Sequence, residues 1–220
     1  MTSPDEIVAV LRARILDLEY PVGAPLREEA LSRELGASRR TVREALISLS
    51  RSGLVDHVPN RGGRVRRFTA ADIADLYQAR RAWEAFGAAQ AGGAEQGALA
   101  AVGEAYAALE QVVRTRSDTA EHAERDMAFH RTVAALAGSP RLDRAFAVLT
   151  EEMLLAIRIL QRAETESALD VEEDLAQHRA IAEAVARRDA ASAVAAVEEH
   201  IRTNRARLLA IADQPVAPPS

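Results

Sequence analysis

The chain of 220 residues contains no cysteine and no lysine, and only 4% of its residues are aromatic. The absence of cysteine excludes disulfide bonds and thiolate ligands, so any metal ion must be held by nitrogen and oxygen donors. Since lysine is absent, all 28 basic side chains are arginine, a usage that indicates a G+C-rich genome as much as a function. An argument for nucleic-acid binding must therefore rest on the position of each arginine.

Long hydrophobic runs are also lacking, because no apolar stretch approaches the roughly 18 residues that a membrane-spanning helix requires. Asp5 and Glu6 lie where an export signal would be basic. We therefore expect no membrane span and a cytoplasmic protein. The 48% of hydrophobic residues is ordinary for a globular protein of one domain or two small ones.

Charge is divided unevenly along the chain. Residues 1–68 hold 12 arginines against 9 acidic residues, whereas the remainder holds 16 against 24. A pI near 5.6 argues weakly against nucleic-acid binding, but a phosphate backbone responds to the local charge. The partition favours a basic module over residues 1–68 and a second domain over 69–213. Residues 214–220, with three prolines, predict a disordered tail.

The segment from Gly36 to Leu46 is typical of a tight turn followed by a helix. Gly36 closes a turn without a Cβ penalty, and Ser38 is a good helix N-cap. Apolar residues then repeat at helical spacing and predict a buried face: Val42, Ala45, Leu46 and Leu49. The first turns carry three arginines outwards: Arg39, Arg40 and Arg43. In helix-turn-helix proteins, this part of the second helix reaches the bases and phosphates of DNA.

The flanking segments complete a winged module. A first helix is expected over 6–18 and a short positioning helix over 27–35. Downstream, 53–55 ends the recognition helix and opens a strand. The sequence 61–63 predicts a turn before a second strand over 64–67. The result would be a winged helix-turn-helix domain.

These segments, in this order and spacing, resemble the GntR-type winged-helix transcription regulators. The resemblance implies that Arg39 and Arg43 read or grip DNA. Further DNA contacts would come from Ser38, Arg40, Thr41, Arg61 and Gly62. Two departures mean that no operator sequence can be borrowed from a relative: Arg40-Thr41 replaces a common Thr-Pro, and Glu29 replaces an arginine that contacts DNA in fatty-acid-responsive members. The alternative for each arginine is a solvated surface charge.

From Thr69 onwards, alanine-rich segments of helical period follow one another. They predict a mainly α protein whose second domain is an all-α, antiparallel six-helix bundle, because short connections make sequence neighbours antiparallel. The helices are expected at about 70–91, 97–116, 119–137, 140–163, 169–187 and 190–212.

Four polar residues on the predicted bundle form a candidate metal site. Asp126 and His130 are four apart and share a helix face, while His178 and His200 lie on apolar faces of later helices. Buried imidazoles and carboxylates are costly unless paired or coordinated. One carboxylate and three imidazoles are a plausible ligand set for a first-row divalent cation. The alternative is that each histidine is separately a satisfied core residue or partly exposed.

The same order of ligands resembles the metal-binding set of the FCD effector domain, which follows GntR-type winged helices in the FadR branch. Six helices resemble its VanR subgroup. The resemblance implies a divalent metal, with zinc favoured over nickel, manganese or iron, and a small organic acid as effector. Arg80 would bind the acid's carboxylate, the alternative being a surface ion pair with Glu84. His122 is expected at the surface, and His57 belongs to the wing.

The sequence thus predicts a homodimeric repressor or activator that binds a pseudo-palindromic DNA operator and responds to a small carboxylate effector. One alternative keeps the DNA module but makes the metal purely structural. Another is a metal-dependent enzyme. We expect no catalytic residue and no enzyme, because neither Glu124 nor Glu183 has the spacing of a general base. The effector, the metal, the operator and the sign of regulation are left open.

Overall fold

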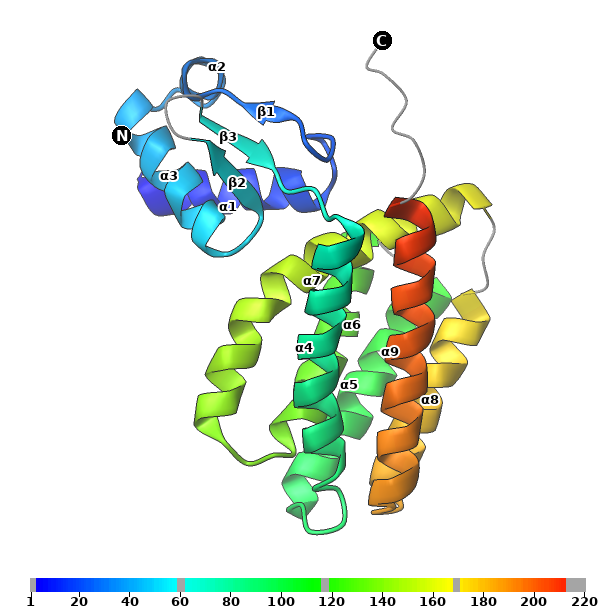
Figure 1. Cartoon of the computed structure of the whole chain (residues 1–220). Coiled ribbons are helices and arrows are strands. Elements are labelled where there is room, and N and C mark those ends of the chain that lie inside the picture. Colours follow the sequence, from blue (N-terminus) through cyan, green and yellow to red (C-terminus); the bar gives the residue numbers. More distant parts are fainter. Residues whose placement is uncertain (1–2, 59–61, 116–118, 168–170, 213–220) are drawn as a thin grey trace. The chain divides into compact units, whose positions relative to one another are not determined.

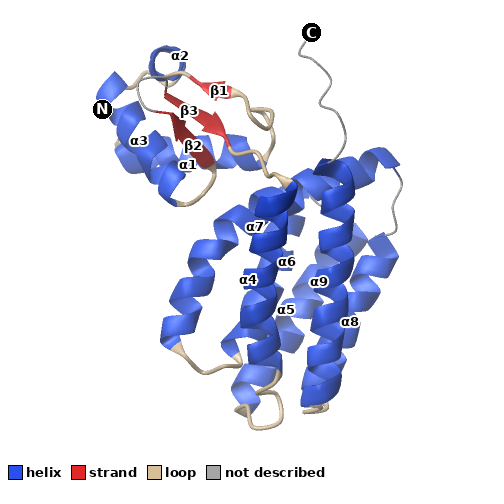
Figure 2. Ribbon diagram, viewed as in Figure 1, coloured by secondary structure: helices blue, strands red, loops and turns tan. Residues whose placement is uncertain are grey.

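The computed structural model describes residues 3–58, 62–115, 119–167 and 171–212 (Figure 1). The predicted tail and Arg61 lie outside these ranges. The chain divides into two compact units, Met1–Arg67 and Phe68–Ser220. The strands all lie in the first unit, as Figure 2 shows. Within the described residues, no helix has the length and apolarity needed to cross a membrane.

The first unit packs three helices against a small sheet. Helix α1 (Pro4–Leu16) begins at a capping box made by Ser3 and Glu6, and α2 (Glu28–Glu34) precedes α3 (Arg39–Arg51). The predicted buried face of α3 is confirmed, since all four of its apolar positions are buried: Val42, Ala45, Leu46 and Leu49. The winged helix-turn-helix prediction is therefore correct.

The wing sheet differs from the prediction in two respects. Strands β1 (Pro25–Leu26), β2 (Val55–Val58) and β3 (Gly62–Val65) form an antiparallel sheet in the order β1-β3-β2. The second wing strand thus begins at Gly62 rather than at residue 64, and β1 was missed because two residues carry no periodicity. Gly62 has φ of 84°, and a Cβ there would lie 2.8 Å from the Leu26 carbonyl oxygen. Glycine therefore lets β1 and β3 approach each other.

The second unit is all-α, as predicted. Its helices are α4 (Ala70–Ala88), α5 (Gln96–Thr115), α6 (Thr119–Ala135), α7 (Pro140–Ser167), α8 (Val171–Ala186) and α9 (Ala190–Ala212). Helix α4 packs against α6 and α9, α5 against α6 and α8, and α8 against α9 (Figure 1). Helix α4 ends earlier than expected and α7 runs further, while the remaining ends differ by one or two residues.

Helix α4 holds a key position in this unit. Two residues separate its first residue, Ala70, from the end of the first unit, and its N-cap Thr69 forms a capping box with Asp72. Near its other end, a Cβ on Gly87 would lie 2.3 Å from the Val133 carbonyl oxygen of α6. Only glycine allows this approach, which brings the buried side of α4 against α6.

Candidate functional site

The first candidate site is the exposed face of α3. The side chains of Arg39, Arg40 and Arg43 are mostly solvent-exposed, whereas the apolar side chains of the same helix are buried. Ser38 caps the helix, because its Oγ accepts a hydrogen bond from the Thr41 backbone N–H at 3.1 Å. The two hydroxyl oxygens lie 2.8 Å apart. The start of α3 is therefore rigid and presents positive charge to solvent.

Carboxylates of α2 already hold two of these arginines. Arg43 donates from Nε and Nη2 to the two carboxylate oxygens of Glu28, at 2.9 and 2.7 Å, and these hydrogen bonds raise the pKa of Arg43. Arg39 Nη2 lies 3.1 Å from Glu29 Oε1. Arg40 pairs within its own helix with Glu44 at 2.9 Å. The exposed pairs of Arg39 and Arg40 contribute little to stability, so phosphates can replace their carboxylates at little cost. Glu28 is less exposed, at 20%, and holds Arg43 with two hydrogen bonds.

The wing residues among the predicted DNA contacts are Arg61, which lies outside the described residues, and Gly62. Gly62 serves the packing of β1 against β3, as described above. Arg64, on β3, donates from Nη1 to the Gly23 carbonyl oxygen at 3.2 Å. This side chain is tied to the body of the unit.

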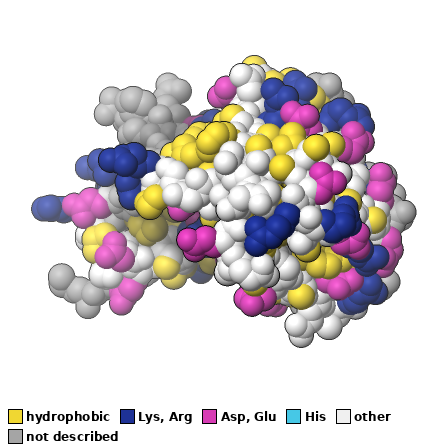
Figure 3. Space-filling model, turned by 90° about the horizontal axis from the view of Figure 1, so that it is seen from below, with side chains coloured by type: hydrophobic (Ala, Val, Ile, Leu, Met, Phe, Trp, Pro, Cys, Tyr) yellow, Lys and Arg dark blue, Asp and Glu magenta, His cyan; other side chains and the backbone are white. Residues whose placement is uncertain are grey.

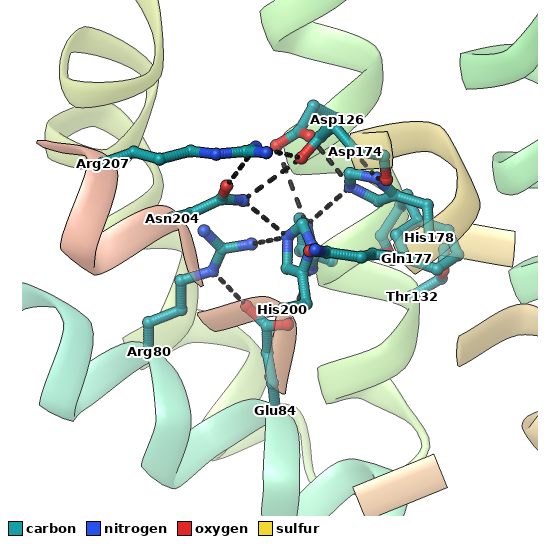
Figure 4. A network of polar contacts seen from close by, with 12 residues as sticks. Arg80, Glu84, Asp126, Thr132, Asp174, Gln177, His178, His200, Asn204 and Arg207 are labelled. Carbon is teal, nitrogen blue, oxygen red and sulfur yellow. Dashed lines mark hydrogen bonds and ion pairs between the residues drawn. The ribbon is translucent and has the colours of Figure 1, made fainter. Parts of the chain in front are cut away.

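The second candidate site is a polar cluster inside the helical unit (Figure 4). The structure brings together the four predicted metal ligands, which come from α6, α8 and α9: Asp126, His130, His178 and His200. All four are buried, and the three histidines are fully enclosed. On the face drawn in Figure 3, charged side chains of both signs are interspersed and no histidine is visible. The cluster thus belongs to the interior.

Ligand atoms of the four residues converge. One nitrogen from each histidine lies within 4.8 Å of the others, and the Nε2 atoms of His130 and His178 are 3.2 Å apart. The carboxylate of Asp126 lies 3.0 Å from His178 Nε2 and 3.8 Å from His130 Nε2. Neutral imidazole and carboxylate donors at this spacing fit a first-row divalent cation.

The other ring nitrogen of each histidine faces an oxygen. His130 Nδ1 is 2.7 Å from Glu84 Oε2, His178 Nδ1 is 2.8 Å from the Asp174 carbonyl, and His200 Nδ1 is 3.2 Å from Gln177 Oε1. Each of these oxygens can accept a hydrogen bond from Nδ1–H, which leaves Nε2 of a neutral ring with its lone pair for a metal ion. Metal-binding histidines are oriented in this way, so the site is prepared for a cation by its surroundings as well as by its ligands.

Sequence reasoning missed these supporting residues. Asp174 lies four residues before His178, which repeats the spacing of Asp126 and His130 and could have been noticed. Glu84 was considered only as a partner of Arg80. Gln177 has no recognisable signal, because it lies next to His178 in the sequence yet serves His200 on another helix.

The pKa values of the three histidines in the cluster are shifted in opposite directions. Burial lowers the pKa of His178, but Asp174 and Asp126 outweigh it and raise the pKa to about 9. Burial, together with nearby positive charge, lowers the pKa of His130 and of His200. Hydrogen bonding to His178 and nearby positive charges lower the pKa of Asp126 despite its burial. Without a metal ion, His178 is therefore the protonated histidine of the cluster near neutral pH.

Arg80 lies beside the cluster, fully buried, and not at the surface. Its Nε donates to Glu84 Oε1 at 2.7 Å, so the ion pair considered as the alternative exists, but it is buried. Its Nη2 lies 3.3 Å from His200 Nε2. His122, expected at the surface, is partly buried, and burial lowers its pKa. The surface position expected for His122 was therefore wrong, and the surface ion pair considered as the alternative for Arg80 is excluded.

Comparisons with known proteins match both units of the chain. Residues 4–65 match the bacterial regulatory proteins of the gntR family, and residues 75–203 match the FCD domain. A crystal structure of a GntR transcriptional regulator from Rhodococcus sp. RHA1 has a TM-score of 0.79 at 28% identity and covers 94% of this chain and 97% of its own. The resemblance inferred from sequence is confirmed at the level of family and domain.

Two curated relatives cover most of the chain. An uncharacterised helix-turn-helix regulator from an unstable DNA locus of Streptomyces ambofaciens is 34% identical, over 91% of this chain and 83% of its own. A protein from Paenarthrobacter nicotinovorans, described as a probable D-xylose utilization operon transcriptional repressor, is 30% identical, over 82% and 77%. The chain therefore belongs to the GntR family, as a DNA-binding transcriptional regulator with an FCD domain.

Proposed function

We propose that this regulator is a repressor whose affinity for its operator is set by a small organic acid bound at a divalent metal ion in the helical unit. The observation that carries the proposal is the convergence of one nitrogen from each of three buried histidines, whose Nδ1 atoms each lie close to an oxygen. Such a set is costly to bury without a cation. The repressor assignment is supported by the description of the Paenarthrobacter relative.

The DNA contacts are assigned to the start of α3 and to the wing. Arg39 and Arg43 would exchange their carboxylate partners for bases or phosphates, with Ser38, Arg40, Thr41, Arg61 and Gly62 close to the backbone. Because a single recognition helix covers only a few base pairs, we propose a homodimer on a pseudo-palindromic operator. A chromosomal operator implies action in the cytoplasm.

The metal ligands in the proposal are Asp126, His130, His178 and His200, with zinc as the first candidate and nickel, manganese or iron as alternatives. A bound cation would supply a Lewis-acidic contact for a carboxylate. Arg80 is the proposed partner of that carboxylate, since a guanidinium can donate two parallel hydrogen bonds. Effector binding and operator binding would then be coupled reciprocally.

Elemental analysis and native mass spectrometry of the purified chain, before and after chelation, test the metal, the acid and the dimer together. The proposal expects about one divalent metal ion per subunit in a dimer, removable and reloadable. A chain that stays free of metal after reloading would refute the metal site and leave only the DNA-binding function. If chelation lowered the melting temperature but no small acid bound to the loaded protein, the metal would be structural instead.

A further inference from the structure

The buried cluster has no direct opening to solvent. The side chains of His130, His178 and His200 are 0% exposed, and Asp126 is 6% exposed. A small acid that binds at this cluster must therefore pass between the helices, and at least one side chain has to move to let it through. Such a side chain should border the cluster on one side and a surface cavity on the other.

A surface groove of about 260 Å³ lies between α4 and α9. Its lining residues are three or four positions apart on each helix, so one face of α4 and one face of α9 form its walls. The charged residues of the lining are exposed, which opens the groove to solvent. The lining includes Tyr77 and Arg81 of α4, and Glu198, Ile201, Arg202 and Arg205 of α9.

Tyr77 separates this groove from the cluster. It lines the groove, yet only 1% of its surface is exposed, so it closes the inner side of the groove. The centre of its ring lies 5.7 Å from the guanidinium carbon of Arg80. Arg80 Nη2 in turn lies 3.3 Å from His200 Nε2. A path from the groove past the Tyr77 ring therefore leads directly to the cluster.

The Tyr77 side chain is held by packing rather than by a hydrogen bond. Its hydroxyl is buried and has no hydrogen-bond partner in the described part of the chain. A rotation of the ring therefore breaks no hydrogen bond of the hydroxyl, and local movements of this kind control access to many closed sites. We propose that Tyr77 is a gate, and that the effector enters the cluster from the groove when the ring moves aside. The proposal rests on the proposed function and adds a route of entry to it.

The charge of the groove favours anions. Its lining contains three arginines and one glutamate, Glu198, which accepts a hydrogen bond from Arg81 Nη1 at 2.9 Å. Outside the lining, Glu199 accepts a hydrogen bond from Arg202 Nε at 3.0 Å. Even when both glutamates are counted, the three arginines exceed them by one charge. Excess positive charge in a cleft raises the local concentration of anions and their rate of association, so the groove suits the entry of an organic acid.

A second surface cavity, of about 360 Å³, lies between α6 and α7. One arginine and one aspartate line it, Arg131 and Asp143, so its charges balance. Its lining includes neither Tyr77 nor Arg80, and none of the four proposed metal ligands. The groove between α4 and α9 is therefore the better route for an acid.

The test measures how fast chelators remove Co²⁺ from the full, loaded chain, because the visible absorption of Co²⁺ reports its coordination. Dipicolinate is the anionic chelator, and phenanthroline is the neutral one. Tyr77→Ala removes the ring, whereas Tyr77→Phe keeps the ring without the hydroxyl. Leu76→Ala is the matched control, because Leu76 is also buried on α4 but does not line the groove. Cobalt content and melting temperature are measured for every variant.

We expect Tyr77→Ala to speed the removal of Co²⁺ by both chelators about tenfold or more, since the barrier to entry is gone. Tyr77→Phe and Leu76→Ala should behave as the wild type does. Arg205→Ala should slow removal by dipicolinate at low salt, and less so at high salt, without changing removal by phenanthroline. Arg114→Ala, at an exposed arginine of α5, should change neither rate.

Equal rates in the wild type and Tyr77→Ala would overturn the gate. Equal acceleration in Tyr77→Ala and Leu76→Ala would also overturn it, because a general loosening of the helical unit would then explain the faster removal. So would a wild-type rate that does not depend on chelator concentration, since the metal would then leave without entry of the chelator. These results leave the proposed function intact, whereas a wild type that takes up no Co²⁺ would refute the proposed function and the route together.

Discussion

Arginine–carboxylate pairs occur in both candidate sites, but their surroundings are opposite. At the start of α3, the pair of Arg39 and Glu29 is exposed on both sides. In the helical unit, Arg80 and Glu84 are about 1% and 0% exposed, and Glu84 also faces His130. An exposed pair exchanges partners at little cost, whereas a buried pair leaves an uncompensated charge when it is broken.

The difference indicates what each region is built to do. On the proposed DNA-binding face, Arg39 and Arg40 form exposed ion pairs, and a polyanion can displace their carboxylate partners. The buried cluster fixes each ring nitrogen and each charge in place, which suits the recognition of one small ion and its ligand. Substitutions can disrupt one of the two sites and leave the other intact, and so measure how much each site depends on its ion pairs.

The largest effect is expected for the double substitution His178→Ala with His200→Ala. Removing two of four ligands should abolish stoichiometric metal binding, because each lost ligand removes a coordinate bond. Metal content by elemental analysis checks this, with His122→Ala as the control that keeps the metal. One metal ion per chain in the double variant would refute the site, and operator binding by its separate DNA-binding unit should persist in the absence of effector.

Arg43→Ala should abolish or severely weaken operator binding, since one arginine contact to a base contributes about 1–3 kcal/mol and a dimer loses two. Gel shifts with an operator selected on the wild type measure the loss. Arg81→Ala is a matched control, because Arg81 has the same exposed fraction of 59% and pairs with Glu198. Unchanged binding by the Arg43 variant would exclude the proposed groove contact.

Glu84→Gln should lower the free energy of unfolding by about 3–5 kcal/mol, because it leaves the buried charge of Arg80 unpaired. Its metal affinity should also fall by about 10- to 100-fold, since Glu84 orients His130. Urea unfolding and competition with a chelator measure the two effects. A Glu84→Gln variant as stable as the wild type would show that the buried ion pair between Arg80 and Glu84 does not stabilise the helical unit.

Acid should weaken metal binding through His178. Its pKa of about 9 in the metal-free protein means that a metal ion must displace a proton, so apparent affinity should rise by up to about tenfold per pH unit towards pH 9. Because the folded pKa is raised, this group stabilises the metal-free protein below its unfolded pKa of about 6.5 and loses that contribution as pH rises through 9. Chelator competition measures how metal affinity changes with pH, and melting temperatures measure how the stability of the metal-free protein changes with pH. His178→Asn should remove both of these pH dependences.

The smallest effect is expected for Glu29→Gln, which breaks the exposed pair with Arg39. Stability should change by less than about 1 kcal/mol. Affinity for random-sequence duplex DNA should rise modestly, because a carboxylate no longer competes with phosphates. Fluorescence anisotropy at two salt concentrations measures this. A loss of stability comparable to that of the Glu84 variant would remove the contrast between the regions.

The sequence predicted much of this architecture because strong local signals agreed with the tertiary packing. The capping residue Ser38, the apolar spacing of α3 and the glycines between helices mark real boundaries. Strand β1 was missed, since two residues have no period, and the start of β3 was misplaced because Gly62 and Gly63 looked like a turn. Those glycines serve close strand contacts instead.

The candidate metal residues were found because Asp126 and His130 share a helix face and two further histidines lie on apolar faces. The residues that orient them were missed, because their contacts join positions far apart in the chain. His130 meets Glu84 across 46 residues, and His200 meets Gln177 across 23. No spacing rule on one helix contains that information. For the same reason the sequence left a surface pair with Glu84 open as the alternative for Arg80, because spacing on one helix does not show that the pair is buried.

The short passage from the first unit into α4 has a mechanical consequence. Only Phe68 and Thr69 separate the DNA-binding unit from a helix that carries Tyr77, Arg80 and Glu84 on its buried side. At a rise of 1.5 Å per residue, Tyr77 lies about 12 Å along the helix axis from Thr69, the N-cap of α4. A helix behaves as a stiff rod over such a length, so a small rotation or slide of α4 at the cluster is carried to the first residue of that helix.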